Sequence, residues 1–521
     1  MLSFSAPATR RLPAARAFAV IALCMVPVST ALTNVFCGLF AAALVISPEF
    51  WRELRSFVTE PASLAALLIL AALAAGITYT VAPHPKAWNW VAKYDKLLLL
   101  PFAALAFRHS NWAPIVRRAW FGTLCVILVL STTNYLGLTS IGPAHSTELP
   151  LSRAWVFKNH IAAGMFGALL FYPAADLALS ARSAPARAAY AGVAAWSLIN
   201  VFVMLQGRTG QVIALLLILV VAVRFVLVLR RQSPLRASLA AGALVLAGAA
   251  LVAAACTVHN GRLTKVVSEV QQYRQTDAVT STGLRLEWYK KGLELYRMRP
   301  VIGYGAGGLE FEFQKLAAGK TAAEGQLTSN PHNEYLLMAV QLGTIGVLLF
   351  VNLIVQIARG SRGLDPRSKH LLLAWLAIFT IGSLANSLLL DFAEGHLLVL
   401  LAGILLGCGA ARSDTLPRGT AARRRSAWGG RLAVGGWRLA AGDWRRGTGD
   451  WGLATGDWRL AVGNWRLATG DWRLATGGHR VACRTVSCTA ARVRRHPYSA
   501  LQTVRLVRVS PDAPDRAATY R

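Results

Sequence analysis

Charged side chains are scarce in this sequence. Only 15% of its 521 residues are Asp, Glu, Lys or Arg, whereas 55% are hydrophobic, and the mean hydropathy is +0.44. A soluble globular chain carries roughly 25% charged residues. The composition therefore excludes an ordinary soluble domain and predicts a protein that lies in a lipid bilayer.

Acidic residues are the scarcer of the two signs, so the chain carries a formal charge of +31. The segment 412–521 contributes +14, with 21 Arg and no Lys, and the preceding 411 residues contribute +17. In those 411 residues the basic side chains lie mostly in short gaps between apolar runs, which is how membrane proteins set their orientation. The charge therefore gives no support for a nucleic-acid partner.

Signatures of several enzyme classes are missing. Seven cysteines are scattered, and none of the five that precede residue 412 lies at a metal-ligand or redox spacing from another. The sequence has no Walker A string, no HExxH motif and no GxSxG elbow. The glycine-rich GYGAGG at 303–308 follows a helical pattern and not a strand, which favours a turn over a phosphate cradle. We therefore expect no metal and no cofactor, and a substrate that is already activated.

Apolar runs long enough to cross a bilayer recur along the chain. Since a spanning helix needs roughly 20 mainly apolar residues, we predict an all-α, polytopic integral membrane protein with about twelve transmembrane helices. The run at 17–46 is either one long helix or two short spans, and Pro27 with the polar residues after it favours two. The predicted spans are 15–31, 32–48, 62–82, 93–107, 119–137, 159–178, 188–206, 211–229, 237–256, 333–357, 371–390 and 395–411.

The placement of basic residues predicts the orientation of these spans. If the N-terminus is cytoplasmic, alternate loops are cytoplasmic, and the basic clusters fall in those loops. A single helix at 17–46 would place every later cluster outside. We therefore predict a multi-pass protein of the bacterial inner membrane with both termini in the cytoplasm. The clusters are Arg52 and Arg55; Arg108, Arg117 and Arg118; Arg182 and Arg187; Arg230, Arg231 and Arg236; Arg359, Arg362, Arg367 and Lys369.

Two segments differ from the spans in kind. Within the membrane domain, predicted over 1–411, the stretch 257–332 forms one large periplasmic loop between spans nine and ten, and 284–300 has the pattern of an amphipathic helix. The tail at 412–521 is rich in Arg and Trp and repeats the heptapeptide GDWRLAT. One seven-nucleotide DNA word, GGCGACT, encodes this heptapeptide when it is read through three frames. We interpret the tail as disordered or aberrantly translated, without a functional role for its Trp residues.

Four polar features stand near the predicted periplasmic ends of spans. Arg208 lies in a short turn (GRTGQV), Arg285 begins the amphipathic helix, His332 precedes a span (PHNEYLL), and Asp391 lies between the last two spans (LLLDFAEGH). Each has a structural explanation by itself, such as an arginine that reaches lipid head groups. Together, two arginines suit a lipid diphosphate, and a neutral imidazole beside them suits proton abstraction from a hydroxyl.

The order of these motifs resembles the O-antigen ligase and polymerase superfamily. GRTG between two helices is followed by R-x-x-W at 285–288, RPVIGYGAGG at 299–308, PHNEYL at 331–336 and QLGTIG at 341–346. The resemblance covers most of 15–411. It implies a membrane glycosyltransferase whose donor is a glycan on undecaprenyl diphosphate and which needs neither ATP nor metal. By the matching positions, His332 would be the general base, Arg208 and Arg285 the diphosphate ligands, and Asp391 an orienting acid.

From this resemblance we expect an inverting O-antigen ligase that transfers O-antigen polysaccharide to lipid A core in the periplasm during lipopolysaccharide biosynthesis. An O-antigen polymerase and a protein O-oligosaccharyltransferase would use the same donor and remain alternatives. The single long loop favours the ligase, because polymerases often have two. A polysaccharide transporter is disfavoured, since the spans carry almost no charge apart from Arg224 and show no repeated halves.

Overall fold

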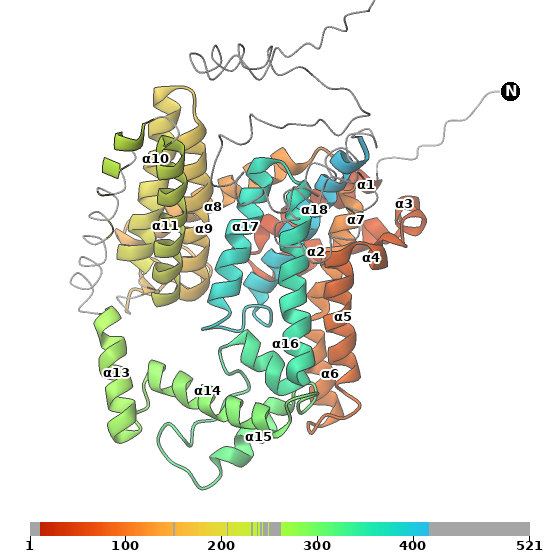
Figure 1. Cartoon of the computed structure of the whole chain (residues 1–521), viewed down its shortest axis with the longest axis vertical. Helices are drawn as coiled ribbons and strands as arrows, with labels where there is room; N and C mark the ends of the chain where they lie inside the picture. Colours follow the sequence, from red (N-terminus) through yellow and green to blue (C-terminus); the bar gives the residue numbers. More distant parts are fainter. Residues whose placement is uncertain are drawn as a thin grey trace, which may run out of the picture. The chain divides into compact units, whose positions relative to one another are not determined.

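The computed structural model describes residues 11–148, 152–205, 207–230, 233–236 and 262–415, with isolated positions between 238 and 248. All regular elements in this part of the chain are helices (Figure 1). The all-α prediction is therefore confirmed for these residues, which belong to one compact unit, Met1–Leu416. The GDWRLAT repeats and, apart from isolated positions, the predicted span 237–256 lie outside the described residues.

Six helices are long and apolar enough to cross a membrane, and three shorter apolar helices accompany them within the described ranges. The chain is accordingly a polytopic membrane protein, while the number twelve stays a prediction. The long helices are α8 (Ala113–Tyr135), α9 (His160–Ser180), α10 (Ala184–Ile199) with its π-helical continuation η3 (Asn200–Leu205), α11 (Arg208–Arg230), α16 (Glu334–Gly360) and α18 (Phe392–Thr415). The shorter ones are α1 (Arg11–Met25), α2 (Thr30–Val45) and α5 (Pro61–Ala75).

Several helices begin where a polar side chain caps the free backbone N–H groups of the first turn. Asn159 opens α9 by accepting hydrogen bonds from the backbone N–H groups of residues 161 and 162, and Asn333 opens α16 in the same way. Asp365 caps α17 (Pro366–Gly382). Ser29 caps α2, so the run at 17–46 is two helices, as Pro27 predicted.

Two predicted spans differ from the observed helices. The span 93–107 is divided into the 3₁₀ helix η1 (Asp95–Leu98) and α7 (Leu99–Ala106), preceded by α6 (His84–Ala92). The polar pair Asp95–Lys96 stands at this division, and the Lys96 ammonium donates hydrogen bonds to two backbone carbonyls of the turn at 383–391. That turn occupies the second half of the predicted span 371–390, because α17 ends at Gly382.

The most buried of the long helices is α18. In the 18-residue apolar stretch of α18, 89% of the residues are buried. In the corresponding stretches of α8 and α11, only 28% are buried. A helix that is apolar on all sides belongs in a protein interior. Accordingly α18 packs against α7 and α17, while α5 packs on α16 and α9 packs on both α10 and α11. The interior of the unit is therefore built around the last helix.

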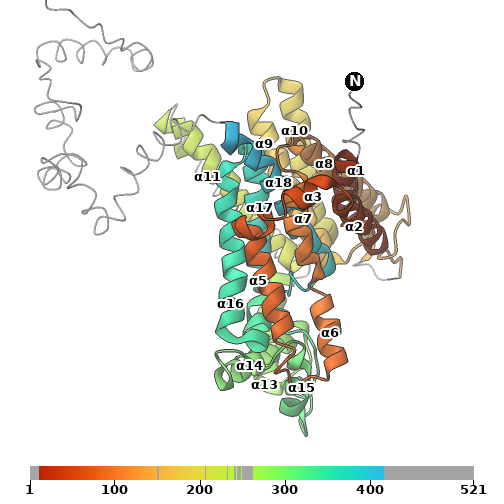
Figure 2. The ribbon, with the colours of Figure 1, turned by 90° about the vertical axis from the view of Figure 1, so that its right-hand side faces the viewer.

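Shorter helices complete the unit. They are α3 (Pro48–Arg52), α4 (Ser56–Thr59), α13 (Arg262–Thr276), α14 (Ser281–Met298), α15 (Gly308–Ala317) and η4 (Ser361–Gly363). Figures 1 and 2 both show α13, α14 and α15 gathered at one end of the unit, below α16. The predicted amphipathic helix is α14, which Thr280 caps and whose observed bounds are Ser281–Met298.

The glycine-rich stretch at 303–308 joins α14 to α15 and lies against a break in α16. Gly343 has a φ of 64° inside α16, where a side chain would lie 2.2 Å from the Val301 carbonyl. Gly305 donates its backbone N–H to the Gln341 carbonyl at 2.9 Å, and Gly307 donates to the Gln341 side chain at 2.9 Å. The other N–H groups from 303 to 308 also bond protein carbonyls. The stretch is therefore a packing turn, and its N–H groups are not available to a phosphate.

We predict that Gly343→Ala destabilises the protein by at least about 3 kcal/mol, because the new methyl group clashes with backbone and the residue keeps a positive φ. Gly137→Ala is the matched control. Gly137 also has a positive φ, but no heavy atom lies within 4 Å of the place that a methyl group would take, so the loss should be about 1 kcal/mol. Thermal unfolding in detergent measures both; equal losses would contradict the steric argument.

Candidate functional site

The structure brings Arg208, Arg285 and His332 together near α13 and α14. Arg208 begins α11, and its guanidinium donates a hydrogen bond of 3.1 Å to the Thr282 hydroxyl in the first turn of α14. Arg285 lies one turn further along α14. Its charge acts on both Arg208 and His332. The three residues predicted from the sequence therefore form one cluster, carried by the first two turns or the N-terminal flank of three separate helices.

The two arginines form an electropositive site. Burial lowers the pKa of the Arg285 guanidinium, and the neighbouring positive charge of Arg208 lowers it further. Two cations held this close repel one another unless an anion lies between or beside them. The pair is thus suited to an anionic ligand, and planar guanidinium groups bind phosphate oxygens two at a time.

Glu269 on α13 occupies Arg208 in this structure. Its two carboxylate oxygens accept from the guanidinium at 2.7 and 3.1 Å, and it also accepts from the Thr282 hydroxyl and backbone N–H. The hydrogen bonds from Arg208 lower the pKa of the Glu269 carboxyl from 4.5 to about 2. Sequence reasoning missed this residue, because it lies 61 positions from Arg208 in a helix without a recognisable motif.

His332 has the environment of a neutral base. Burial lowers the pKa of its imidazole below 6.5, and the positive charge of Arg285 lowers it further. Its ring stacks on Trp288 with a centroid separation of 5.3 Å and an interplanar angle of 29°. Its φ of 53° is in the left-handed region, a strained conformation for a residue with a side chain. An imidazole that is uncharged near pH 7 is able to accept a proton from a hydroxyl.

Hydrogen bonds hold the strained backbone of His332. The Asn330 side-chain oxygen accepts from the His332 N–H at 2.8 Å and from the Ser387 hydroxyl at 2.7 Å. The Tyr289 hydroxyl lies 3.1 Å from the His332 carbonyl and 2.8 Å from the Leu384 carbonyl, and its single proton can serve one of them at a time. Helix α14 and the turn at 383–391 therefore fix the segment on which the histidine stands.

Asp391 lies in a neighbouring polar cluster. Lys96 donates to its backbone carbonyl at 2.9 Å and interacts electrostatically with its carboxylate, as does the neighbouring Glu394. Glu334, which is fully buried, belongs to the same cluster: its carboxylate accepts from the backbone N–H groups of Leu389 and Leu390 at 2.9 and 3.2 Å. The observed contacts of Asp391 thus tie it to Lys96, and its role as an orienting acid stays a prediction.

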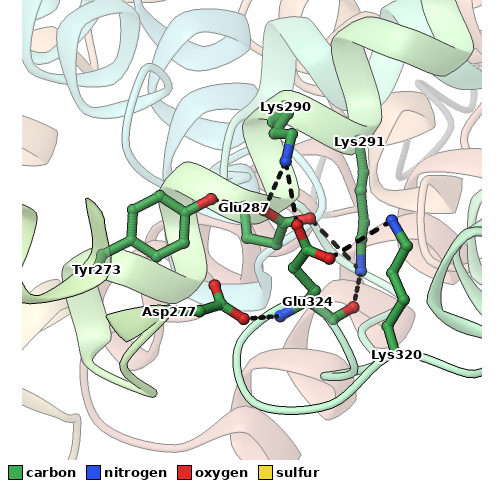
Figure 3. Close-up of polar contacts among 7 residues, drawn as sticks. All are labelled: Tyr273, Asp277, Glu287, Lys290, Lys291, Lys320 and Glu324. Atoms are coloured by element: carbon green, nitrogen blue, oxygen red, sulfur yellow. Dashed lines mark hydrogen bonds and ion pairs between the residues drawn. The ribbon is translucent and has the colours of Figure 1, made fainter. Parts of the chain in front are cut away.

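A second set of polar contacts supports α14 at Glu287 and Lys291 (Figure 3). Glu287, only 1% exposed, accepts from the Tyr273 hydroxyl of α13 at 2.6 Å and pairs with the buried Lys291 at 3.8 Å. Lys291 also donates to the backbone carbonyl of Glu324, which ties α14 to the segment after α15. Because Glu287 is roughly 200° around the helix from Arg285, these contacts leave the arginine free to face the site.

Among the described residues, no group of three or more His, Cys, Asp and Glu side chains is placed to hold a metal ion. The cysteines Cys24, Cys37, Cys125 and Cys408 are free thiols within the same part of the chain. The groups that the site brings together among the described residues are two guanidinium groups, one imidazole and the carboxylate of Glu269.

Part of the chain matches a known protein family. No curated protein matches the sequence. Residues 193–351 match the family model described as O-antigen ligase, and this segment contains Arg208, Glu269, Arg285 and His332. Members of that family are glycosyltransferase-like enzymes that act on lipid-linked glycans in a membrane. Over residues 193–351 the chain is thus similar to the O-antigen ligase family, and this match supports membership of that superfamily.

Proposed function

We propose that this protein is an O-antigen ligase, which transfers O-antigen polysaccharide from undecaprenyl diphosphate to lipid A core. The observation that carries the proposal is the meeting of two arginines with a half-buried histidine, whose pKa is lowered by burial and by the charge of Arg285. The arginines supply a diphosphate site and the histidine supplies a base, and these are the two functions that such a transfer needs. The family match at 193–351 supports the glycan donor class.

In the proposed reaction, Arg208 and Arg285 bind the diphosphate of the donor. His332 takes the proton from an acceptor sugar hydroxyl, and the resulting oxygen attacks the anomeric carbon of the glycan. The bond between this carbon and the diphosphate oxygen breaks, and its electron pair leaves with undecaprenyl diphosphate. The arginines offset the charge that develops on the leaving group, so we propose a reaction that requires no metal. Direct displacement predicts inversion at the anomeric carbon.

The proposal includes a topology. About twelve spans within 1–411 would cross the bacterial inner membrane, with both termini in the cytoplasm, and residues 257–332 would form the periplasmic loop. Arg208, Arg285 and His332 would then lie at the periplasmic face, where both lipid-linked substrates are accessible. The helices α13, α14 and α15, which lie in this loop, gather at one end of the unit, and this arrangement supports a common side for the site.

We expect His332→Ala to abolish ligation in cells that lack the chromosomal gene. Lipid A core should stay undecorated while polymer accumulates on the carrier lipid, because loss of a general base costs roughly 10²–10⁴-fold in rate. Gel analysis of lipopolysaccharide and of the carrier-linked pool measures this. His109→Ala is the control, since His109 also has a positive φ but lies between α7 and α8. Normal decoration in the His332 variant would end the proposal, and core carrying one repeat in the deletion strain would indicate a polymerase.

The pH dependence of the reaction tests the state of His332. Since the neutral imidazole is the reactive form and its pKa lies below 6.5, we expect kcat/KM to be level at neutral pH. Activity should fall only as the pH drops below about 6.5, where the imidazole becomes protonated. The measurement uses reconstituted enzyme with purified donor and acceptor. An acid limb centred above pH 7 would contradict a general base in this environment.

Glu269→Gln tests whether the carboxylate competes with the donor for Arg208. An uncharged amide binds the guanidinium less strongly, so the donor should displace it more easily. We expect KM for the donor to fall up to about fivefold with little change in kcat, since partly exposed ion pairs contribute about 0.2–1 kcal/mol. Glu294→Gln removes a charge from an exposed position of α14 and is the control. A rise in KM for the donor would show instead that Glu269 orients Arg208 productively.

A further inference from the structure

A second polar cavity lies far from His332, at the opposite ends of the helices. It has a volume of about 290 Å³ and is lined by residues of α8, α9, α10 and α17. The position of the cavity follows from Arg224, which pairs with the cavity residue Asp176. Arg224 lies sixteen residues after Arg208 along α11. At 1.5 Å per residue, this is about 24 Å from the first site. The two sites are therefore on opposite faces of the helical unit.

The cavity has an excess of positive charge. Three arginines line it, Arg117, Arg118 and Arg367, whereas Asp176 is the only carboxylate among the described residues of its lining. Asp176 is already paired with Arg224 at 2.9 Å and lies 3.5 Å from the imidazole of His370. The carboxylate of Asp176 thus pairs with Arg224 and does not neutralise the positive charge of the three lining arginines.

Two of the three arginines are not neutralised within the described structure. Arg117 donates to Asp365 at 2.9 Å and to the Ser368 hydroxyl, so its charge is paired. The side chains of Arg118 and Arg367 have no ion-pair partner among the described residues, and both residues are exposed. They stand on α8 and α17, on two sides of the same cavity. An anion there would contact two guanidinium groups from different helices.

The remaining lining is apolar and aromatic. Trp120 and Phe121 come from α8, Tyr172 from α9 and Tyr190 from α10. Pro173 also lines the cavity from within α9, where its missing N–H leaves a carbonyl one turn earlier without its helical partner. Ile115 and Leu179, one and two residues from the lining residues Pro114 and Leu177, are 48% and 49% exposed on helices long enough to span a membrane. The cavity thus combines exposed guanidinium groups with an apolar and aromatic lining.

We propose that this cavity binds the phosphate group of an anionic phospholipid such as phosphatidylglycerol. Arg118 and Arg367 bind the phosphate oxygens, and the aromatic lining receives the glycerol and the first part of the acyl chains. Basic pockets between transmembrane helices bind anionic head groups in this way. The volume is at the lower end of the range for small-molecule pockets, roughly 300 Å³, which fits a head group and not a whole lipid. The site is independent of the proposed glycan transfer.

The test is a titration of the detergent-purified full chain with dioctanoyl-phosphatidylglycerol, followed by thermal unfolding. We expect the lipid to raise the Tm of the wild type. In the double variant Arg118→Gln/Arg367→Gln, the apparent Kd should weaken roughly tenfold or more for each arginine, because a hydrogen bond to a charged group contributes about 1.5–3 kcal/mol. Both residues are exposed, so the variant is expected to fold.

A matched variant and two further ligands decide the interpretation. Arg52→Gln/Arg362→Gln removes the same charge from exposed positions that do not line the cavity, and it should bind like the wild type. Dioctanoyl-phosphatidylcholine should give no shift. Equal weakening in both double variants, or an equal shift with phosphatidylcholine, would overturn the proposal. A shift of the same size with inorganic phosphate alone would show a free-phosphate site and overturn the lipid assignment.

Discussion

The hydrogen bonds between the start of α16 and the turn at 383–391 are the constraint on which the site depends. Glu334 donates its N–H to the Ser383 carbonyl at 2.9 Å, and its carboxylate accepts from two N–H groups further along the turn. These groups are buried, so water does not replace a bond that is lost. His332 stands two residues before Glu334 in a strained conformation. The position of the proposed base is therefore set by the packing of the last two helices.

The charges of the site suit an anion that is bound only temporarily. Arg208 and Arg285 repel one another, and in the described structure Glu269 offsets one of them. A carboxylate on a separate helix is a weaker and more easily displaced partner than a diphosphate, which offers more oxygens and more charge. Glu269 thereby holds Arg208 in an ordered, ion-paired position from which a diphosphate is able to displace the carboxylate. The helix that bears it, α13, is held to α14 by the Tyr273–Glu287 bond on the other side.

The sequence predicted those features of the structure that depend on neighbouring residues, and it missed those that depend on contacts between distant segments. Apolar length predicted α8, α9 and α16, and helix ends predicted that Arg208, Arg285 and His332 would gather. The break before α7 was not predicted, because it depends on Lys96 reaching carbonyls 294 residues away. Glu269 was missed for the same reason. The glycines at 303–308 showed a tight turn from sequence, but only the contacts with Gln341 show that their N–H groups are already bonded.

The distance between a proposed phosphate ligand and the proposed base is set by one pair of helices. Arg285 lies on α14 and His332 precedes α16, and these helices touch where Gly292 faces Leu336; a side chain at 292 would lie 2.6 Å from that leucine. Beyond this contact, Tyr296 and Thr344 join the helices by a hydroxyl bond of 2.8 Å, next to the break at Gly343. A glycine at each end of the contact lets two backbones approach closely. The glycines around α16 therefore act on the chemistry from a distance, by fixing how near the arginine stands to the histidine.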